Sequence, residues 1–245
     1  MTAPAASPAP ESASLWEDFL EIFIKPAAVF ERRKAAGFAV PLIILTVVFA
    51  VLFIGLKGAF QPIMDAENAR AMAKVIAKNP QMTEEMREAI TKQAAGGGKF
   101  AVVWATVFLP IIVLLVGLTT WAAGKMVGAV TSLGAAMMIA TYSYFPRLLE
   151  LLVSGAQALL LPEEQLTGRA STSLGAARAF DPDTASSMLM VVLLRVDVFT
   201  LWVTFLLAVG LREVGKVSMS KALVAAAIVW VLGALPGVLG AMVSG

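Results

Sequence analysis

The stretch from Phe100 to Ala123 contains no charged residue, and it limits the possible folds more than any other feature. An α-helix rises about 1.5 Å per residue, so about 20 apolar residues cross the hydrocarbon core of a bilayer. The rest of the chain has the same character, because 59% of its 245 residues are hydrophobic and 15% are charged. Soluble domains average about 45–50% and 25%. This composition excludes an ordinary water-soluble core and predicts a membrane protein.

Five segments are long and apolar enough to be predicted spans. They cover residues 39–60, 100–123, 133–161, 185–211 and 221–243. Proline removes a backbone donor and interrupts a helix, so we expect a kink or break near Pro146 in the third span, and the fifth contains Pro236. The predicted fold class is all-α, a polytopic membrane helical bundle of about five transmembrane helices. An odd number of spans places the two termini on opposite sides.

Two segments precede the first span. Residues 1–14 are rich in Ala, Pro and Ser and lack an apolar core, which predicts a disordered N-terminal tail rather than a signal peptide. Ser14 and Glu17 have the spacing of a capping box, so a helix is expected to begin there. Pro26 is expected to end or kink it. Residues 15–38 are therefore predicted to form a cytoplasmic or interfacial amphipathic segment.

The helix in this segment has two predicted faces. Its apolar face carries Leu15, Phe19, Ile22 and Phe23, widened by Trp16, Leu20 and Ile24, and its acidic face carries Glu17, Asp18 and Glu21. The apolar face either lies on the membrane surface or packs on the protein's own bundle. Surface-bound helices prefer Lys and Arg on the polar face, so the sequence favours neither interpretation.

Residues 61–99 are the one sizeable aqueous segment and predict a helical hairpin outside the bilayer. Pro62 suits a helix start, and Asn79-Pro80 suits a stop. Thr83 and the two glutamates that follow it open a second helix, which Gly96 to Gly98 are expected to end. The charges are mixed in sign, so a solvated surface is a better interpretation than a ligand site.

Four ionisable residues fall inside the predicted spans and form the candidate site. Arg147 and Glu150 lie in the third span, and Arg195 and Asp197 lie in the fourth. Each costs about 2.5–3.5 kcal/mol at bilayer depth and requires a partner or a water-filled cavity. We expect Arg147 to reach Asp197 and Glu150 to reach Arg195. Such a cluster either lines a substrate or proton path, as in transporters with broken helices, or holds two helix breaks together. Transporters usually contain internal repeats. Because no repeat is evident in this sequence, the structural interpretation is preferred.

Composition also limits the chemistry. The chain has no Cys and no His, which excludes thiolate and imidazole metal ligands and the usual acid or base at neutral pH. Asp197 is the only Asp inside a span, so paired-aspartate proteolysis is unsupported, and Ser143 would lack a histidine base. We predict no enzyme activity and no cofactor or metal site. The net charge of +2 predicts no nucleic-acid partner.

Basic residues suggest an orientation. Arg32, Arg33 and Lys34 precede the first span, and the short loop after the fourth span carries Arg212, Lys216 and Lys221. The residues after Val243 carry no charge. Because cytoplasmic loops are enriched in Lys and Arg, we predict a cytoplasmic N-terminus and an external C-terminus, although the raw totals on the two sides are nearly equal.

Several short motifs, in their order along the chain, resemble the bacterial branch of the Yip1 domain family. They are Lys25-Pro26-Ala27-Ala28-Val29-Phe30, Gly124-Lys125-Met126-Val127-Gly128, Tyr142-Ser143-Tyr144-Phe145-Pro146, Leu201-Trp202 with Gly210-Leu211, and Val217-Ser218-Met219-Ser220-Lys221-Ala222. The resemblance covers about Trp16 to Met242. It implies a five-helix integral membrane domain, here residues 39–245, with a cytoplasmic N-terminus. The family has no common catalytic residue to transfer, and segment 61–99 is longer than its core implies. Eukaryotic relatives are associated with Rab GTPases and membrane traffic, an activity that we do not transfer to this chain.

The sequence thus predicts a non-catalytic integral membrane protein of the Yip1 type, which organises the membrane or recruits a partner. The alternative is a small transporter or channel that uses Arg147, Glu150, Arg195 and Asp197. The expected partners are the lipid bilayer and a membrane or cytoplasmic protein of unknown identity. Gly233-x-x-x-Gly237 allows close helix packing, either between copies of the chain or, preferably, within it. The expected location is the bacterial cytoplasmic (inner) membrane.

Overall fold

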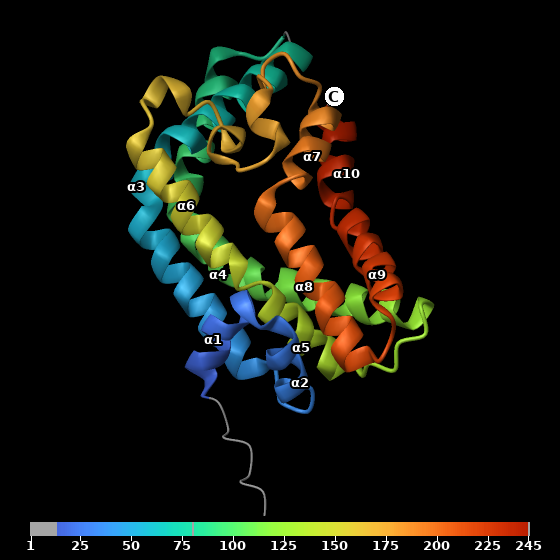
Figure 1. The fold of residues 1–245 in the computed structure, drawn as a ribbon. Helices are drawn as coiled ribbons and strands as arrows, with labels where there is room; N and C mark the ends of the chain where they lie inside the picture. Colours follow the sequence, from blue (N-terminus) through green and yellow to red (C-terminus); the bar gives the residue numbers. More distant parts are fainter. Residues whose placement is uncertain (1–13, 80, 245) are drawn as a thin grey trace, which may run out of the picture.

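A computed structural model describes the backbone of residues 14–79 and 81–244, and their side chains apart from 90–106 and 243–244. The predicted tail, residues 1–13, lies outside these ranges. The α-helices are α1 (Leu15–Ile24), α2 (Pro26–Arg33), α3 (Ala39–Lys78), α4 (Glu84–Met126), α5 (Leu133–Ser143), α6 (Pro146–Leu160), α7 (Ser187–Arg195), α8 (Val198–Gly215), α9 (Met219–Leu232) and α10 (Leu235–Ser244). Three short 3₁₀ helices join α6 to α7: η1 (Glu163–Gln165), η2 (Arg169–Thr172) and η3 (Ala176–Ala179). Figure 1 shows these elements arranged as an elongated bundle.

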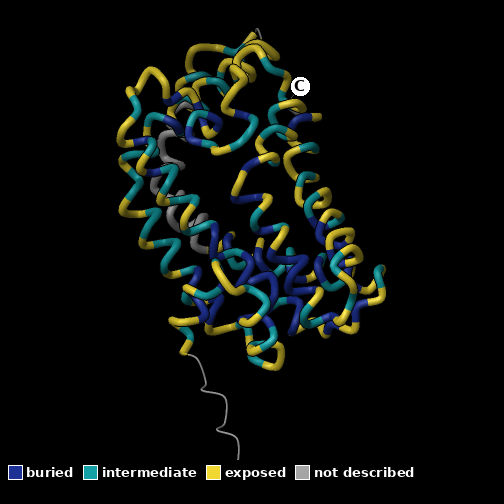
Figure 2. The backbone as a smooth tube through the Cα atoms, in the orientation of Figure 1, coloured by how far each residue is buried: buried dark blue, intermediate teal, exposed yellow. Residues whose placement is uncertain are grey.

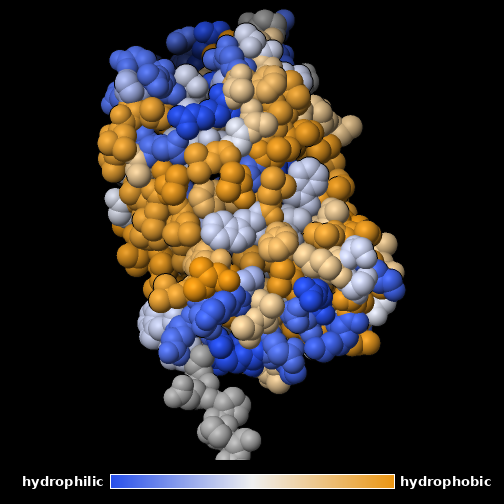
Figure 3. All heavy atoms as spheres, in the orientation of Figure 1, coloured by the Kyte–Doolittle hydropathy of each residue, from blue (hydrophilic) through white to orange (hydrophobic). Residues whose placement is uncertain are grey.

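Four helical segments are long and apolar enough to cross a membrane. They are Ala39–Lys78, Val107–Met126, Val198–Gly215 and Met219–Met242. Figure 3 shows an apolar band between two hydrophilic ends on the face in view. The all-helical membrane bundle predicted from the sequence is therefore confirmed. The third predicted span forms two helices, α5 and α6, and each alone is too short to cross a bilayer. Counted together as one broken span, they bring the total to about five.

The break expected near Pro146 is confirmed, and the fourth and fifth predicted spans are divided as well. α5 ends at Ser143 and α6 begins at Pro146, because proline tolerates the first helical position, where its missing N–H has no partner to lose. α9 ends at Leu232, and Pro236 again lies in the first turn of the following helix, α10. The fourth span divides between Arg195 and Val198, and Asp197 caps the second half.

Two predicted boundaries of segment 61–99 are wrong. Pro62 lies inside α3 rather than at a helix start, and α4 runs without interruption through Gly96 to Gly98. Both helices are already formed in their apolar spans, and extending a helix is far easier than starting one. Glycine costs about 1 kcal/mol relative to alanine, which lowers helix stability without ending a long helix. The segment is therefore a continuation of α3 and α4.

The turn between these extensions follows the sequence prediction. α3 ends at Lys78 with Asn79 as its C-cap, and α4 begins at Glu84. The Thr83 hydroxyl accepts a hydrogen bond from the Met86 amide at 3.4 Å. These local signals are correct because capping depends on residues within one helical turn.

The packed core lies at one end of the bundle. Figure 2 shows the buried residues concentrated where α5 and the adjoining parts of α8 and α9 meet α1 and α2. α5 is buried along most of its length. Glycine permits its close approach to α8, since a Cβ added at Gly210 would lie 2.5 Å from Ile139 Cγ2.

The same end of the molecule is basic. We call it the basic end; it carries Lys34, Lys125, Arg212, Lys216 and Lys221 at the limits of helices α2, α4, α8 and α9. The Val130 amide donates to the Gly215 carbonyl at 3.1 Å, and Lys216 Nζ lies 3.3 Å from Glu31 Oε2. These contacts join α2, the α4–α5 loop and the end of α8 into one surface.

The opposite end is closed by residues 161–186, which we call the cap. Arg70 on the α3 extension donates to Asp183 Oδ1 at 2.6 Å and to the Thr167 carbonyl at 2.8 Å. The Arg169 side chain and backbone amide both donate to Glu67 at 3.0 Å. The Arg70 guanidinium holds the pKa of the Asp183 carboxyl below its usual value of 3.8. The α3 extension therefore anchors the cap.

Candidate functional site: charged residues at the helix breaks

The two helix breaks that contain the predicted charges lie next to each other. Arg147, in the first turn of α6, donates from Nη2 to Thr200 Oγ1 in the first turn of α8, at 3.1 Å. The sequence placed these positions in separate spans, 53 residues apart. The structure thus brings the third and fourth predicted spans together at their breaks, as expected.

Arg147 and Glu150 form the ion pair that their spacing indicates. Arg147 Nη1 lies 2.5 Å from Glu150 Oε2, on one face of α6, because residues three apart in an α-helix are neighbours on its surface. Both side chains are only partly exposed. The pair neutralises itself within one helical turn, so neither group depends on the fourth span for its charge balance.

Asp197 does not pair with Arg147, and this prediction is wrong. One Asp197 carboxylate oxygen accepts the Phe199 amide at 2.9 Å and so caps α8, and the other accepts the Ser173 hydroxyl at 2.9 Å. The Ala176 amide also donates to the Val196 carbonyl at 3.0 Å. Aspartate is a favoured N-cap residue, and its carboxylate accepts hydrogen bonds from backbone amides in the first turn of its own helix. Asp197 therefore fastens the cap to α8.

Arg195 does not pair with Glu150, so this prediction is also wrong. Its guanidinium lies over the Trp230 ring, 5.4 Å from the centroid, and donates to the Trp230 carbonyl at 2.5 Å. The Trp230 indole donates back to the Arg195 carbonyl at 3.2 Å. Within the described residues no carboxylate lies within ion-pair distance of Arg195. Its position at the C-terminus of α7 directs it toward α9 rather than α6.

Gly233 and Gly237 pack within the chain. A Cβ at Gly233 would lie 2.9 Å from Arg195 Nη2, and one at Gly237 would lie 3.1 Å from Val191 Cγ1. Both neighbours belong to α7. The close approach allowed by Gly233-x-x-x-Gly237 is thus used between α7 and the α9–α10 segment.

A second charged cluster was missed by the sequence analysis. Asp18, assigned there to the acidic face of its helix, is fully buried with 0% exposure. Arg32 donates to Asp18 Oδ1 from Nε at 2.9 Å and from Nη2 at 2.5 Å, and Arg33 Nε donates to Oδ2. The signal was the turn at Pro26, because two antiparallel helices on either side of it bring residue 18 opposite residues 32 and 33.

The first helix begins and ends as predicted, and one of its two interpretations is now supported by contacts. Ser14 and Glu17 form the capping box, and α1 stops at Ile24 before Pro26. Phe19 stacks on Phe145 with ring centroids 4.5 Å apart, and Ile22 is buried. One face of α1 therefore packs on the protein's own bundle.

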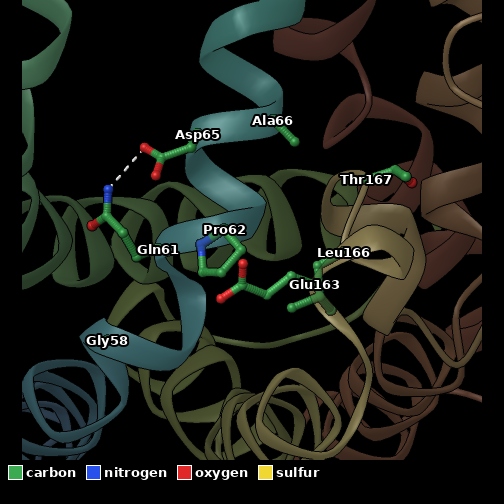
Figure 4. Close-up of a pocket in the computed structure, with 8 residues that line it drawn as sticks. All are labelled: Gly58, Gln61, Pro62, Asp65, Ala66, Glu163, Leu166 and Thr167. Carbon is green, nitrogen blue, oxygen red and sulfur yellow. Dashed lines mark hydrogen bonds between the residues drawn. The ribbon is translucent and has the colours of Figure 1, made fainter.

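A pocket of about 510 Å³ lies between α3 and the cap, away from the four candidate residues. Its lining consists of Gly58, Gln61, Pro62, Asp65, Ala66, Glu163, Leu166 and Thr167 (Figure 4). Gln61 Nε2 donates to Asp65 Oδ1 at 2.8 Å. Among the described side chains, no group of three or more His, Cys, Asp or Glu residues could hold a metal ion. The carboxylates here and at the helix breaks are thus dispersed.

One comparison with known proteins is informative. The sequence model of the Yip1 domain matches residues 20–240, which include every helix from α2 to α9, the second half of α1 and most of α10. No curated protein and no solved structure matches the chain.

Proposed function

We propose, from the premise that the chain belongs to the Yip1 domain family, that this integral membrane protein is non-catalytic and organises the membrane or recruits a partner. The proposal rests on the contacts that the four candidate charged residues make. Arg147 pairs with Glu150, Asp197 caps α8, and Arg195 stacks on Trp230. Arg147 also joins α6 to α8 through Thr200, Asp197 joins residues 161–186 to α8 through Ser173, and Arg195 joins α7 to α9. Glu150 is neutralised by Arg147 within α6. A transport path instead requires polar groups that face a water-filled cavity.

The basic end supports the proposed orientation. The helix limits gathered there carry Lys34, Lys125, Arg212, Lys216 and Lys221, and cytoplasmic loops are enriched in such residues. The C-terminus lies at the opposite end of the bundle from α1 and α2 (Figure 1). We therefore assign the basic end and the N-terminus to the cytoplasm, the cap and C-terminus to the external side, and the chain to a bacterial cytoplasmic membrane.

A transport assay with a matched crosslinking assay tests this function. The full chain is placed in sealed vesicles containing the pH dye pyranine, and proton entry is compared with that of empty vesicles and of the Glu150→Gln and Asp197→Asn variants. We expect the same slow leak in all preparations. A flux above the empty-vesicle value that is lost in either variant, with the variant still folded, would identify a conduction path and overturn the proposal.

Crosslinking in the native membrane tests recruitment. A photoactivatable residue at Lys34 samples the basic end, and one at Val47, which is exposed on α3, samples a lipid-facing position as the control. We expect a defined protein adduct from Lys34 and none from Val47. Lipid adducts alone at both positions would contradict partner recruitment at the basic end.

A further inference from the structure

The first two helices form a tight antiparallel hairpin. Its base is held by the ion pairs of Asp18 with Arg32 and Arg33, and Arg32 Nη2 also lies 2.6 Å from Glu21 Oε2. The turn is the Lys25-Pro26 step, where α1 ends and α2 begins. We refer to α1 and α2 together as the N-terminal hairpin, with its foot near Asp18 and its tip at Lys25.

The foot of the N-terminal hairpin lies at the basic end. Glu31 Oε2 lies 3.3 Å from Lys216 Nζ, which follows the last residue of α8. Hydrogen bonds from Lys34 and from Lys216 lower the pKa of the Glu31 carboxyl below 4.5. These contacts hold the foot at the level where the apolar span α8 ends.

The tip lies well inside the apolar part of the bundle. Phe23, near the tip, contacts Trp202 with ring centroids 5.5 Å apart. At about 1.5 Å per residue, Trp202 is about 20 Å from Gly215 along α8. The same rise makes α1 about 14 Å long, close to half of the roughly 30 Å hydrocarbon core. The hairpin therefore has the length and depth of a single leaflet.

The charged side chains of the N-terminal hairpin form ion pairs, which makes its insertion into the bilayer possible. Asp18 is fully buried against two arginines, and Glu21 is paired with Arg32. Lys25 Nζ lies 3.8 Å from Glu21 Oε1, one turn closer to the foot. Ionisable residues at bilayer depth pair with one another, and a long lysine side chain can direct its ammonium group away from the bilayer centre.

The outer face of α1 is an unpartnered apolar stripe. Trp16, Leu20 and Ile24 are 68%, 72% and 73% exposed, and their spacing of four residues places them in line along the helix. Trp16 lies at the foot, where tryptophan prefers the membrane–water interface, and Leu20 and Ile24 follow toward the tip. This order matches the gradient from headgroups to acyl chains, which identifies lipid as the occupant.

We infer that the N-terminal hairpin is inserted into the leaflet on the basic side of the membrane, with the Trp16–Leu20–Ile24 stripe facing the acyl chains. The helix is steep rather than flat on the surface, and the hairpin enters and leaves the membrane on the same side. This inference goes beyond the proposed function, because it applies whether or not the protein recruits a partner.

Spin labels measure the depth directly. The chain contains no Cys, so the variants Trp16→Cys, Leu20→Cys and Ile24→Cys each carry one nitroxide. The full chain is placed in phosphatidylethanolamine–phosphatidylglycerol vesicles, and collision rates with oxygen and with a water-soluble nickel chelate are compared. Val47→Cys on the exposed face of α3 is the lipid control, and Glu85→Cys in the first turn of α4 is the aqueous control.

We expect all three stripe labels to collide with oxygen more than with nickel, as at Val47. Depth should increase from position 16 to position 24 by about 12 Å, eight residues of helical rise. Equal, shallow depths would show a flat helix and overturn the inference. Strong nickel collisions would place the stripe in water, and low rates with both reagents would show cover by a second copy of the chain; either result also overturns it.

The substituted side chains are exposed, so each variant is expected to keep the melting temperature of the wild type in detergent. If Trp16→Cys lowers the yield in membranes, Leu20→Cys and Ile24→Cys alone still measure a gradient of about 6 Å over four residues. A gradient below half that value contradicts the inserted hairpin.

Discussion

At the residue scale, the ion pairs of Asp18 with Arg32 and Arg33 join α1 to α2, and the Asp18 carboxylate is fully buried. Removing one member of a buried ion pair leaves the others without compensation, at a cost of about 3 kcal/mol or more. We predict that Asp18→Asn lowers the free energy of unfolding by about 3 kcal/mol, because Arg32 and Arg33 lose the carboxylate between them. Thermal melting in detergent measures the change.

The matched control for this variant is Glu17→Gln, one residue away on the same helix and exposed. It removes a carboxylate without unpairing either arginine, so its effect should be limited to the capping box, about 1 kcal/mol. Equal melting of the Asp18 and Glu17 variants would contradict a stabilising role for the buried cluster.

Close helix packing gives a second prediction at this scale. Gly210→Ala places a Cβ 2.5 Å from Ile139 Cγ2, whereas Gly134→Ala adds a Cβ with no neighbour within 4 Å. Overpacking costs about 1–3 kcal/mol, so the first variant should melt earlier and the second should melt at or above the wild-type temperature. Indistinguishable melting curves would rule out the tight contact between α5 and α8.

At the element scale, local signals predicted helix limits well and tertiary contacts poorly. The capping box at Ser14, the Thr83 cap and the break before Pro146 each depend on a few neighbouring residues. The partners of Asp197 and Arg195 depend on how the cap and α9 pack, and no local pattern encodes this. Gly96 to Gly98 failed as a stop signal because the preference of each glycine is small beside the continuity of a long helix.

The cap gives a prediction at the same scale. Arg70→Ala removes the contacts to Asp183 and to the Thr167 carbonyl, so residues 161–186 should exchange backbone hydrogen faster while α5 and α8 keep their protection. Lys57→Ala, on the same helix, is the control and should leave the cap unchanged. Hydrogen exchange with mass spectrometry resolves both regions, and an unchanged cap in Arg70→Ala would contradict its anchoring.

The same contact has a defined pH dependence. Because Arg70 lowers the pKa of Asp183 below 3.8, the folded state favours the ionised carboxylate. The stabilising contact is complete above the usual pKa and is lost only as the pH falls through the lowered value. Cap exchange should therefore be insensitive to pH near neutrality, after correction for the intrinsic rate, and rise only in acid.

At the scale of the whole molecule, composition and span length predicted the membrane bundle correctly, because burial in lipid requires long apolar helices whatever their packing. Span length and Pro146 also predicted α5 and α6 as one broken span, but the position of the N-terminal hairpin could not be derived in this way. It follows from the contacts of Phe19 with Phe145 and of Phe23 with Trp202, which join segments far apart in the sequence.

The central claim is a five-traverse bundle with the N-terminus and the basic end on one side, and single-cysteine labelling tests it most directly. In intact cells a membrane-impermeant thiol reagent is applied to the variants Lys34→Cys, Lys125→Cys, Lys221→Cys, Glu85→Cys, Glu164→Cys and Met242→Cys. The account predicts labelling at Glu85, Glu164 and Met242, with the three lysine positions labelled only after the membrane is opened. Protection of Met242 together with Lys34 would contradict it, since the chain would then cross an even number of times.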